Sequence, residues 1–192
     1  LEKILKVKLK NKIVVINFYP EVSNITKSMH TLKNIFEVIS SIKNIHCIFT
    51  MPSHDIGNDE FENLIIKFAK NNKNYLYYKN LGQTNFLSLL KISSLLVGNS
   101  SSGILEMPSL GKYSINIGHR QKGRIFSKTV IQCSPEIDEL SKKINIYLNQ
   151  KLTSPKNKNI YFKKNTYENI IKYLKQKNFL RNAQIKKFRD IN

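Results

Sequence analysis

The sequence predicts an α/β protein built on a Rossmann-like parallel sheet with helices on both faces. Short apolar runs alternate with longer amphipathic segments over residues 1–150, the order expected of strands and helices in a parallel sheet. The first run, residues 11–18, is apolar throughout rather than at every second position, as in strands buried on both faces. With 41% hydrophobic residues in 192, the chain can bury a core of this kind.

The first elements have clear local signals. The strand at 11–18 is followed by a helix at 26–42, where Leu32, Ile35 and Ile39 recur at helical spacing. A helix at 59–71 has acidic residues in its first turn, where the helix dipole favours negative charge. The remaining strands are expected at 46–51, 74–79, 95–98, 113–118 and 130–133.

Capping residues predict where the later helices begin and end. Thr84 is the expected N-cap of a helix at 84–94. Gly111 is the expected C-cap of a helix at 101–110. Pro135 marks the start of another helix, because proline suits the first helical turn.

We expect two parts in the chain. Residues 1–150 form the Rossmann-like domain, and residues 151–192 comprise a polar linker, a C-terminal helix near 166–176 and a basic tail. The chain begins at Leu1 rather than Met, so we expect a fragment or a trimmed form of a longer protein.

Composition argues against several classes of function. The net charge is +19, but arginine occurs only at positions 120, 124, 181 and 189, so 28 of the 32 basic residues are lysines spread along the chain. This pattern suits steering of an anionic ligand better than nucleic-acid binding. Two distant cysteines without a CxxC pattern predict reduced, buried thiols in a cytoplasmic protein and no metal site. No run of eighteen apolar residues predicts a membrane span.

The stretch GNSSSG, residues 98–103, lies between an expected strand and an expected helix. Ligands of doubly wound sheets bind at the carboxyl ends of strands. Small residues leading into a helix N-terminus offer N–H groups and hydroxyls to a phosphate or diphosphate. The alternative is that these serines only cap the helix.

Two features beside this loop favour a nucleotide diphosphate. Glu106 follows in an apolar stretch, where a carboxylate needs partners, and the two hydroxyls of a ribose can supply them; the alternative is a solvent-facing glutamate. His119, Arg120, Lys122 and Arg124 follow the fifth strand. Arginine can hold phosphate oxygens in a bidentate way, although these residues could also form a solvated loop.

The segment GNSSSGILEMPSLGKYSINIGHRQKGR, residues 98–124, resembles the signature of UDP-N-acetylglucosamine 2-epimerases, especially their hydrolysing branch. Weaker similarities, MPSHDIG at 51–57 and INFYPEV at 16–22, precede it in the family's order. The resemblance covers the C-terminal half of the family. It implies the C-terminal domain of a glycosyltransferase-B-like fold, whose catalytic N-terminal domain is missing from this chain.

The resemblance also implies roles for individual residues. Ser100 and Ser101 would contact the diphosphate of UDP or a UDP-amino sugar, and Glu106 would hold the ribose. Leu81 would lie against the uracil, and Arg120 would face the phosphates or the reacting sugar. The implied reaction is elimination of UDP, then addition of water to the glycal and release of an N-acetylmannosamine-type sugar. No cofactor is implied, and the oligomeric state stays open, a homo-oligomer included.

Three positions depart from the family pattern. Tyr19 replaces an active-site histidine, and a phenol with a pKa near 10 is a poor proton shuttle at neutral pH. Ser53 replaces a substrate-binding asparagine, and His119 stands where aspartate is frequent. Alternatives therefore stay open: half of a UDP-sugar glycosyltransferase, or a truncated and inactive remnant. The fragment alone is expected to be inactive, because chemistry in a cleft needs both walls.

Overall fold

The computed structural model describes residues 11–51, 58–150 and 159–175. They form two units, the first ending at Ile160 and the second beginning at Tyr161. The expected domain boundary at Gln150 stays a prediction, because residues 151–158 lie outside the described residues.

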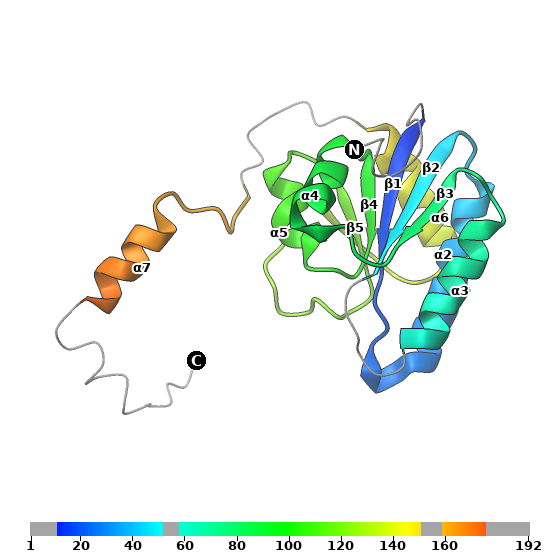
Figure 1. Cartoon of the computed structure of the whole chain (residues 1–192), viewed down its shortest axis with the longest axis horizontal. Helices are drawn as coiled ribbons and strands as arrows, with labels where there is room; N and C mark the ends of the chain where they lie inside the picture. Colours follow the sequence, from blue (N-terminus) through cyan, green and yellow to red (C-terminus); the bar gives the residue numbers. More distant parts are fainter. Residues whose placement is uncertain (1–10, 52–57, 151–158, 176–192) are drawn as a thin grey trace. The chain divides into compact units, whose positions relative to one another are not determined.

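The first unit is built around one six-stranded sheet, in which every pairing is parallel. The strand order is β3-β2-β1-β4-β5-β6 (Figure 1). The strands are β1 (Lys12–Asn17), β2 (Ile45–Thr50), β3 (Tyr75–Tyr78), β4 (Leu95–Gly98), β5 (Ser114–Ile117) and β6 (Val130–Cys133). The chain leaves β1 towards β2 and returns beside β1 with β4, so the order of the strands switches between β1 and β4. The predicted fold class is confirmed.

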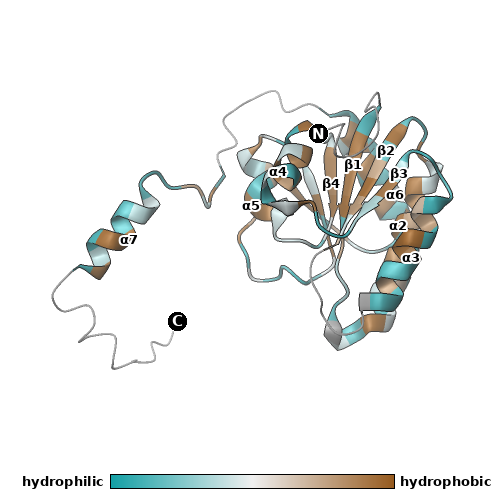
Figure 2. Ribbon diagram, in the orientation of Figure 1, coloured by the Kyte–Doolittle hydropathy of each residue, from teal (hydrophilic) through white to brown (hydrophobic). Residues whose placement is uncertain are grey.

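Helices cover both faces of this sheet (Figure 1). One face packs through a core that includes Leu32, Phe61 and Ile144, under the helices α2 (Ile25–Ser41), α3 (Asn58–Lys70) and α6 (Ile137–Asn149). The opposite face packs through Leu89 and Met107, from α4 (Gly82–Ile92) and α5 (Ser102–Ser109). Burial on both sides explains the continuous hydrophobicity of the strands (Figure 2).

Of the predictions for Gly111 and Thr84 as helix caps, the first is confirmed and the second is wrong. Gly111 is left-handed, with φ +65. Its N–H donates to Pro108, and the next N–H donates to Met107, so the predicted glycine cap is confirmed as a Schellman motif. The prediction for Thr84 is wrong: α4 begins at Gly82, because the Asn80 side chain accepts from the Gly82 N–H at 2.7 Å and starts the turn earlier.

Other local predictions concern helix starts and the cysteines. Glu136 is the N-cap of α6, so the helix begins at Ile137, two residues after Pro135. Asp59 and Glu60 lie in the first turn of α3, as predicted. Cys47 and Cys133 are free and buried, as predicted from their spacing.

The second unit contains α7 (Thr166–Leu174), whereas the short η1 helix (Val22–Asn24) precedes α2 in the first unit. All residues of α7 are exposed. Within the described parts of the chain, no helix has the length and apolarity needed to cross a membrane.

Candidate functional site

The carboxyl edge of the sheet brings polar residues from separate strands together. Asn17 of β1 pairs with Gly98 of β4, and Thr50 of β2 pairs with Tyr78 of β3. Beside this edge lies a cavity of about 360 Å³, which we call the serine-loop cavity. Its walls include Asn17, Tyr19, Thr50, Leu81, Phe86 and Ser102. Its position beside the switch between β1 and β4 is the usual one for ligands of such sheets.

Gly98 lets the serine loop start close to β1. Its φ is +152, and a Cβ at this position would lie 2.0 Å from the Asn17 carbonyl oxygen. No other residue type fits so close to backbone. The sequence therefore uses glycine here to bring Asn99, Ser100 and Ser101 against the end of β1.

The three serines differ in their contacts. The Ser100 hydroxyl accepts from the Ser102 N–H at 3.2 Å. Ser101 is the N-cap of α5 but makes no side-chain cap bond, and among the described residues its N–H donates to no partner. Capping thus accounts for Ser100 and leaves donors of Ser101 available at a helix N-terminus, where an anion is favoured.

Glu106 lies one turn after Ser102 on α5, so the two side chains share a helix face. The residue is half-buried. Its Oε2 atom is buried and has no hydrogen-bond partner among the described residues. A carboxylate oxygen in this state is costly, and a hydroxyl-bearing ligand would satisfy it. The solvent-facing alternative does not describe this oxygen.

Tyr19 and Arg120 meet, although they come from loops a hundred residues apart. The Arg120 guanidinium carbon lies 4.9 Å from the centre of the Tyr19 ring, within cation–π range. Arg120 Nη1 also donates to the Asn99 carbonyl at 3.1 Å. Burial raises the pKa of the Tyr19 phenol, against the opposing effects of hydrogen bonds from Ser100 and Asn17 and the charge of Arg120. Tyr19 is therefore protonated at neutral pH and can donate.

The other basic residues of this loop share the exposure of Arg120 but not its contacts. His119, Lys122 and Arg124 are exposed, and their side chains make no hydrogen bond or ring contact within the described part of the chain. The expected alternative of a solvated loop therefore fits these three side chains.

The resemblance predicts that Leu81 forms a wall for the uracil. It is the N-cap of α4, packs against the core of the α4–α5 face and lines the serine-loop cavity beside Phe86. Ser53 belongs to residues 52–57, which lie outside the described residues, so its predicted contact with the ligand stays a prediction.

Three wall residues were not anticipated from the sequence. Phe86 offers an aromatic face. Asn17 and Thr50 are 4% and 8% exposed, and Asn17 Oδ1 and Thr50 Oγ1 have no partner among the described residues. A polar residue ending an apolar strand was the available signal for both. Unpartnered polar atoms in a cavity wall indicate a polar occupant.

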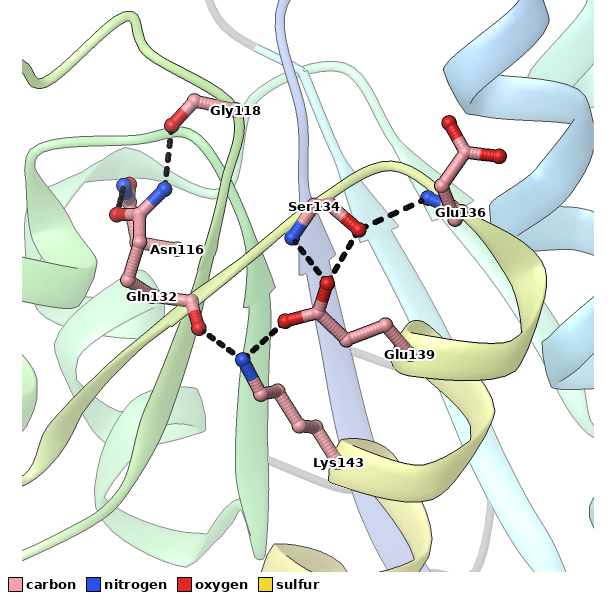
Figure 3. A network of polar contacts seen from close by, with 7 residues as sticks. All are labelled: Asn116, Gly118, Gln132, Ser134, Glu136, Glu139 and Lys143. Carbon is pink, nitrogen blue, oxygen red and sulfur yellow. Dashed lines mark hydrogen bonds and ion pairs between the residues drawn. The ribbon is translucent and has the colours of Figure 1, made fainter.

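A second cavity, of about 380 Å³, lies between the N-terminal parts of α2 and α6, and we call it the α2–α6 cavity. Its walls include Phe18, Glu21, Gln132, Ser134, Glu139 and Lys143. Figure 3 shows that the polar side chains of one wall bond to one another. Lys143 donates to Glu139 and to the Gln132 carbonyl, and the Ser134 hydroxyl donates to Glu139.

The fold and the site together describe a Rossmann-like domain with a polar cavity at the carboxyl edge of its sheet. The sequence profile of the UDP-N-acetylglucosamine 2-epimerase family matches residues 1–175. The chain belongs to this family, which confirms the resemblance seen in the serine-loop signature.

Curated relatives agree with this assignment. The chain is 34% identical to the polysialic acid biosynthesis protein P7 of Escherichia coli, over 95% of this chain and 47% of the relative. It is also 34% identical to the GDP/UDP-N,N'-diacetylbacillosamine 2-epimerase (hydrolyzing) of Campylobacter jejuni, over 73% of this chain and 36% of the relative. The chain thus spans about half the length of the first relative and less of the second.

Solved structures share the fold. The UDP-GlcNAc 2-epimerase of Methanocaldococcus jannaschii, in complex with UDP-GlcNAc and UDP, superposes with a TM-score of 0.67 at 21% identity, covering 86% of this chain and 45% of that one. The Staphylococcus aureus MnaA–UDP structure gives 0.71 at 15% identity, covering 100% and 51%. A spinosyn rhamnosyltransferase gives 0.51 at 9% identity. The fold therefore matches half of a glycosyltransferase-B-like architecture.

Proposed function

We propose that this chain is the UDP-binding half of a hydrolysing UDP-amino-sugar 2-epimerase. The observation that carries the proposal is the combination on α5: unpartnered donors of Ser101 at its N-terminus and the buried, unpartnered Oε2 of Glu106. A nucleoside diphosphate complements both, because its phosphates accept hydrogen bonds and its ribose hydroxyls donate them. Relatives named as hydrolysing epimerases support the branch.

In the proposed binding mode, each wall has one task. Ser100 and Ser101 donate to the diphosphate at the α5 N-terminus, and Glu106 accepts from the ribose. Leu81 and Phe86 flank the uracil, while Asn17 and Thr50 satisfy remaining polar groups of the ligand. Ser53 is proposed as a further contact, from the segment that follows Thr50.

The reaction proposed for the complete protein is loss of UDP, addition of water and release of a free, 2-epimerised amino sugar. Breaking the glycosidic C–O bond puts negative charge on the leaving diphosphate. Arg120, held against Tyr19, supplies positive charge beside it, and the protonated Tyr19 supplies a hydrogen bond. Removal of the proton from C2 of the sugar requires a base, and the described residues of this chain place none beside Tyr19 and Arg120. We assign this base to a further domain that forms the other wall of the cleft.

The first test is calorimetric titration of the chain with UDP, with uridine and Glu106→Ala as controls. UDP binding that is tighter than uridine binding and depends on Glu106 supports the nucleotide site. Equal, weak binding of both ligands, unchanged in the variant, contradicts it.

The second test separates the reactions and uses the complete protein. UDP-N-acetylglucosamine and UDP-N,N'-diacetylbacillosamine are incubated in turn, and products are identified by NMR. Free UDP together with a free 2-epimerised sugar supports the hydrolysing reaction. An epimerised sugar that stays joined to UDP indicates the non-hydrolysing branch. Sugar transfer that requires an added acceptor indicates a glycosyltransferase, which the similarity to the rhamnosyltransferase fold brings into consideration.

A further inference from the structure

Asn99 joins three loops at the site, although it lies too deep to touch a ligand. The residue stands between Gly98, which ends β4, and the three serines, and it is 0% exposed. Its N–H donates to the Asn17 carbonyl at 3.2 Å. Its side chain faces the loop after β1, and its carbonyl faces the loop after β5.

The side chain of Asn99 clamps the backbone of Tyr19. Asn99 Oδ1 accepts from the Tyr19 N–H at 2.8 Å, and Asn99 Nδ2 donates to the Tyr19 carbonyl at 2.9 Å. The amide therefore pairs with both backbone groups of one residue, much as a neighbouring strand would. This pairing also fixes the orientation of the amide, because reversing it would place donor against donor.

The carbonyl of Asn99 anchors the basic loop. It accepts from Arg120 Nη1 at 3.1 Å and from Gln121 Nε2 at 2.8 Å. Gln121 is 4% exposed, so its bond is shielded from water, whereas Arg120 is exposed. Gln121 is thus the fixed anchor of this loop, and Arg120 is the member that can reach a ligand.

We infer that Asn99 and Gln121 are positioning residues, which hold Tyr19 and Arg120 at set places relative to the diphosphate loop. The inference rests on the proposed function, because it concerns the same site. Ser100 and Ser101, the proposed hydrogen-bond donors to the diphosphate, follow Asn99 directly. A shift of Asn99 would therefore move these two serines together with Tyr19 and Arg120. Small misplacements of such groups cost far more in rate than in binding.

Asparagine has a combination of properties that its nearest replacements lack. Aspartate cannot donate, and it would place a buried negative charge beside the Tyr19 carbonyl. Alanine leaves the Tyr19 N–H and carbonyl without partners. Glutamine keeps the amide but adds a methylene in a fully buried position.

The test compares Gln121→Met, Asn99→Ala and the control Asn34→Ala in the complete protein. Gln121→Met keeps the volume and removes only the bond to Asn99. We expect kcat for UDP release to fall about tenfold or more, with the Kd for UDP within about threefold of the wild-type value, because the serine loop is unchanged. Asn99→Ala should lower kcat further and weaken UDP binding as well.

Asn34 is a matched control because it is also a buried asparagine, 7% exposed, whose amide donates to a backbone carbonyl, that of Pro135 at 2.9 Å. Asn34→Ala should lower the melting temperature without changing kcat. If it lowers kcat as much as Gln121→Met at equal thermal stability, the role of Gln121 is only structural. Unchanged kcat in Gln121→Met also overturns the inference, and this variant carries the test if Asn99→Ala does not fold.

Hydrogen exchange gives a readout that is independent of turnover. Asn99→Ala should speed exchange of the Tyr19 amide, whereas Gln121→Met should leave it protected. If the wild-type protein neither binds UDP nor releases it, the proposed function itself fails and the inference fails with it. A wild-type protein that is active, beside variants that are unaffected, overturns the inference alone.

Discussion

The serine-loop cavity and the α2–α6 cavity have similar volumes, about 360 and 380 Å³, yet they differ in how their polar walls are satisfied. In the α2–α6 cavity, Gln132, Ser134, Glu139 and Lys143 bond to one another (Figure 3). In the serine-loop cavity, Asn17 and Thr50 each retain a buried atom with no partner among the described residues.

This difference indicates which cavity is built for a ligand. Polar groups that satisfy one another hold a structure together. Buried polar groups without partners lower stability, and a protein retains them where a ligand completes them. Cys133, in the α2–α6 cavity, adds to the contrast, because burial raises the pKa of its thiol to about 12, which leaves it unreactive at neutral pH.

The largest expected effect is on stability, and it distinguishes two glycines: Gly98 before the serine loop and Gly118 in the wall of the α2–α6 cavity. A Cβ at Gly98 would meet the Asn17 carbonyl oxygen at 2.0 Å, whereas at Gly118 the nearest atom is Glu21 Oε1 at 3.9 Å. Gly98→Ala should lower the free energy of unfolding by more than about 3 kcal/mol, since backbone must move. Gly118→Ala should lower it by about 1 kcal/mol, the cost of a left-handed alanine.

Urea unfolding of the two variants measures both free energies. Equal losses would contradict the idea that the approach of β4 to β1 demands glycine at position 98. UDP binding should also disappear in Gly98→Ala, because the serine loop starts from this residue.

Much of the fold was predictable because strands that are buried on both faces, such as β1 and β4, are apolar over nearly their whole length. The strands at 11–18 and 95–98 were predicted from their apolar runs alone. The start of α4 was not predictable from Thr84 alone, because the turn is set by Asn80, whose side chain captures the Gly82 N–H. Local competition between two capping residues decides such boundaries.

The site divides in the same way. The serines and Glu106 lie within seven residues of one another, so the sequence of one loop and one helix is enough to find them. Asn17, Thr50 and Phe86 join Ser102 in the wall of the serine-loop cavity only through strand register and helix packing, which the sequence does not display. Asn99 was visible beside the serines, but its partners Tyr19 and Gln121 lie 80 and 22 residues away.

The second prediction compares two carboxylates, Glu106 on α5 beyond the serine loop and Glu139 at the α2–α6 cavity. Glu106→Ala should weaken UDP binding about tenfold or more, the usual loss of hydrogen bonds to a charged group. Stability should be unchanged or higher, because a buried oxygen without a partner is removed. Glu139→Ala should leave UDP affinity unchanged and lower stability.

Calorimetry measures the UDP affinity of both variants, and thermal unfolding measures their stability. Equal UDP affinity in Glu106→Ala would end its assignment to the ribose. Loss of UDP binding in Glu139→Ala would place the nucleotide in the other cavity.

The third prediction compares two serines and has a smaller expected effect. Ser101→Ala should weaken UDP binding several-fold, about the contribution of one hydrogen bond, with no loss of stability, because its hydroxyl makes no bond within the described structure. Ser134→Ala should leave UDP binding unchanged and lower the melting temperature, because the Ser134 hydroxyl bonds to Glu139 and to the Glu136 N–H. A drop in melting temperature for Ser101→Ala alone would mean that Ser101 serves as a cap after all.

The smallest expected effect is the acid response of the α2–α6 cavity. Hydrogen bonds from Lys143 and Ser134 lower the pKa of Glu139 to about 2, from an ordinary value of 4.5. A lowered pKa in the folded state means that the charged form stabilises the fold above pH 4.5. This contribution should decline as the pH falls from 4.5 through about 2. The difference in stability between the wild-type protein and Glu139→Gln should therefore become smaller as the pH falls through this range.

Thermal unfolding of the wild-type protein and of Glu139→Gln between pH 6 and pH 2.5 measures that deficit. A deficit for Glu139→Gln that stays constant over the range would mean that these bonds do not depend on its charge. The network would then hold the α2–α6 wall by geometry alone, and the electrostatic half of the contrast between the two cavities would fail.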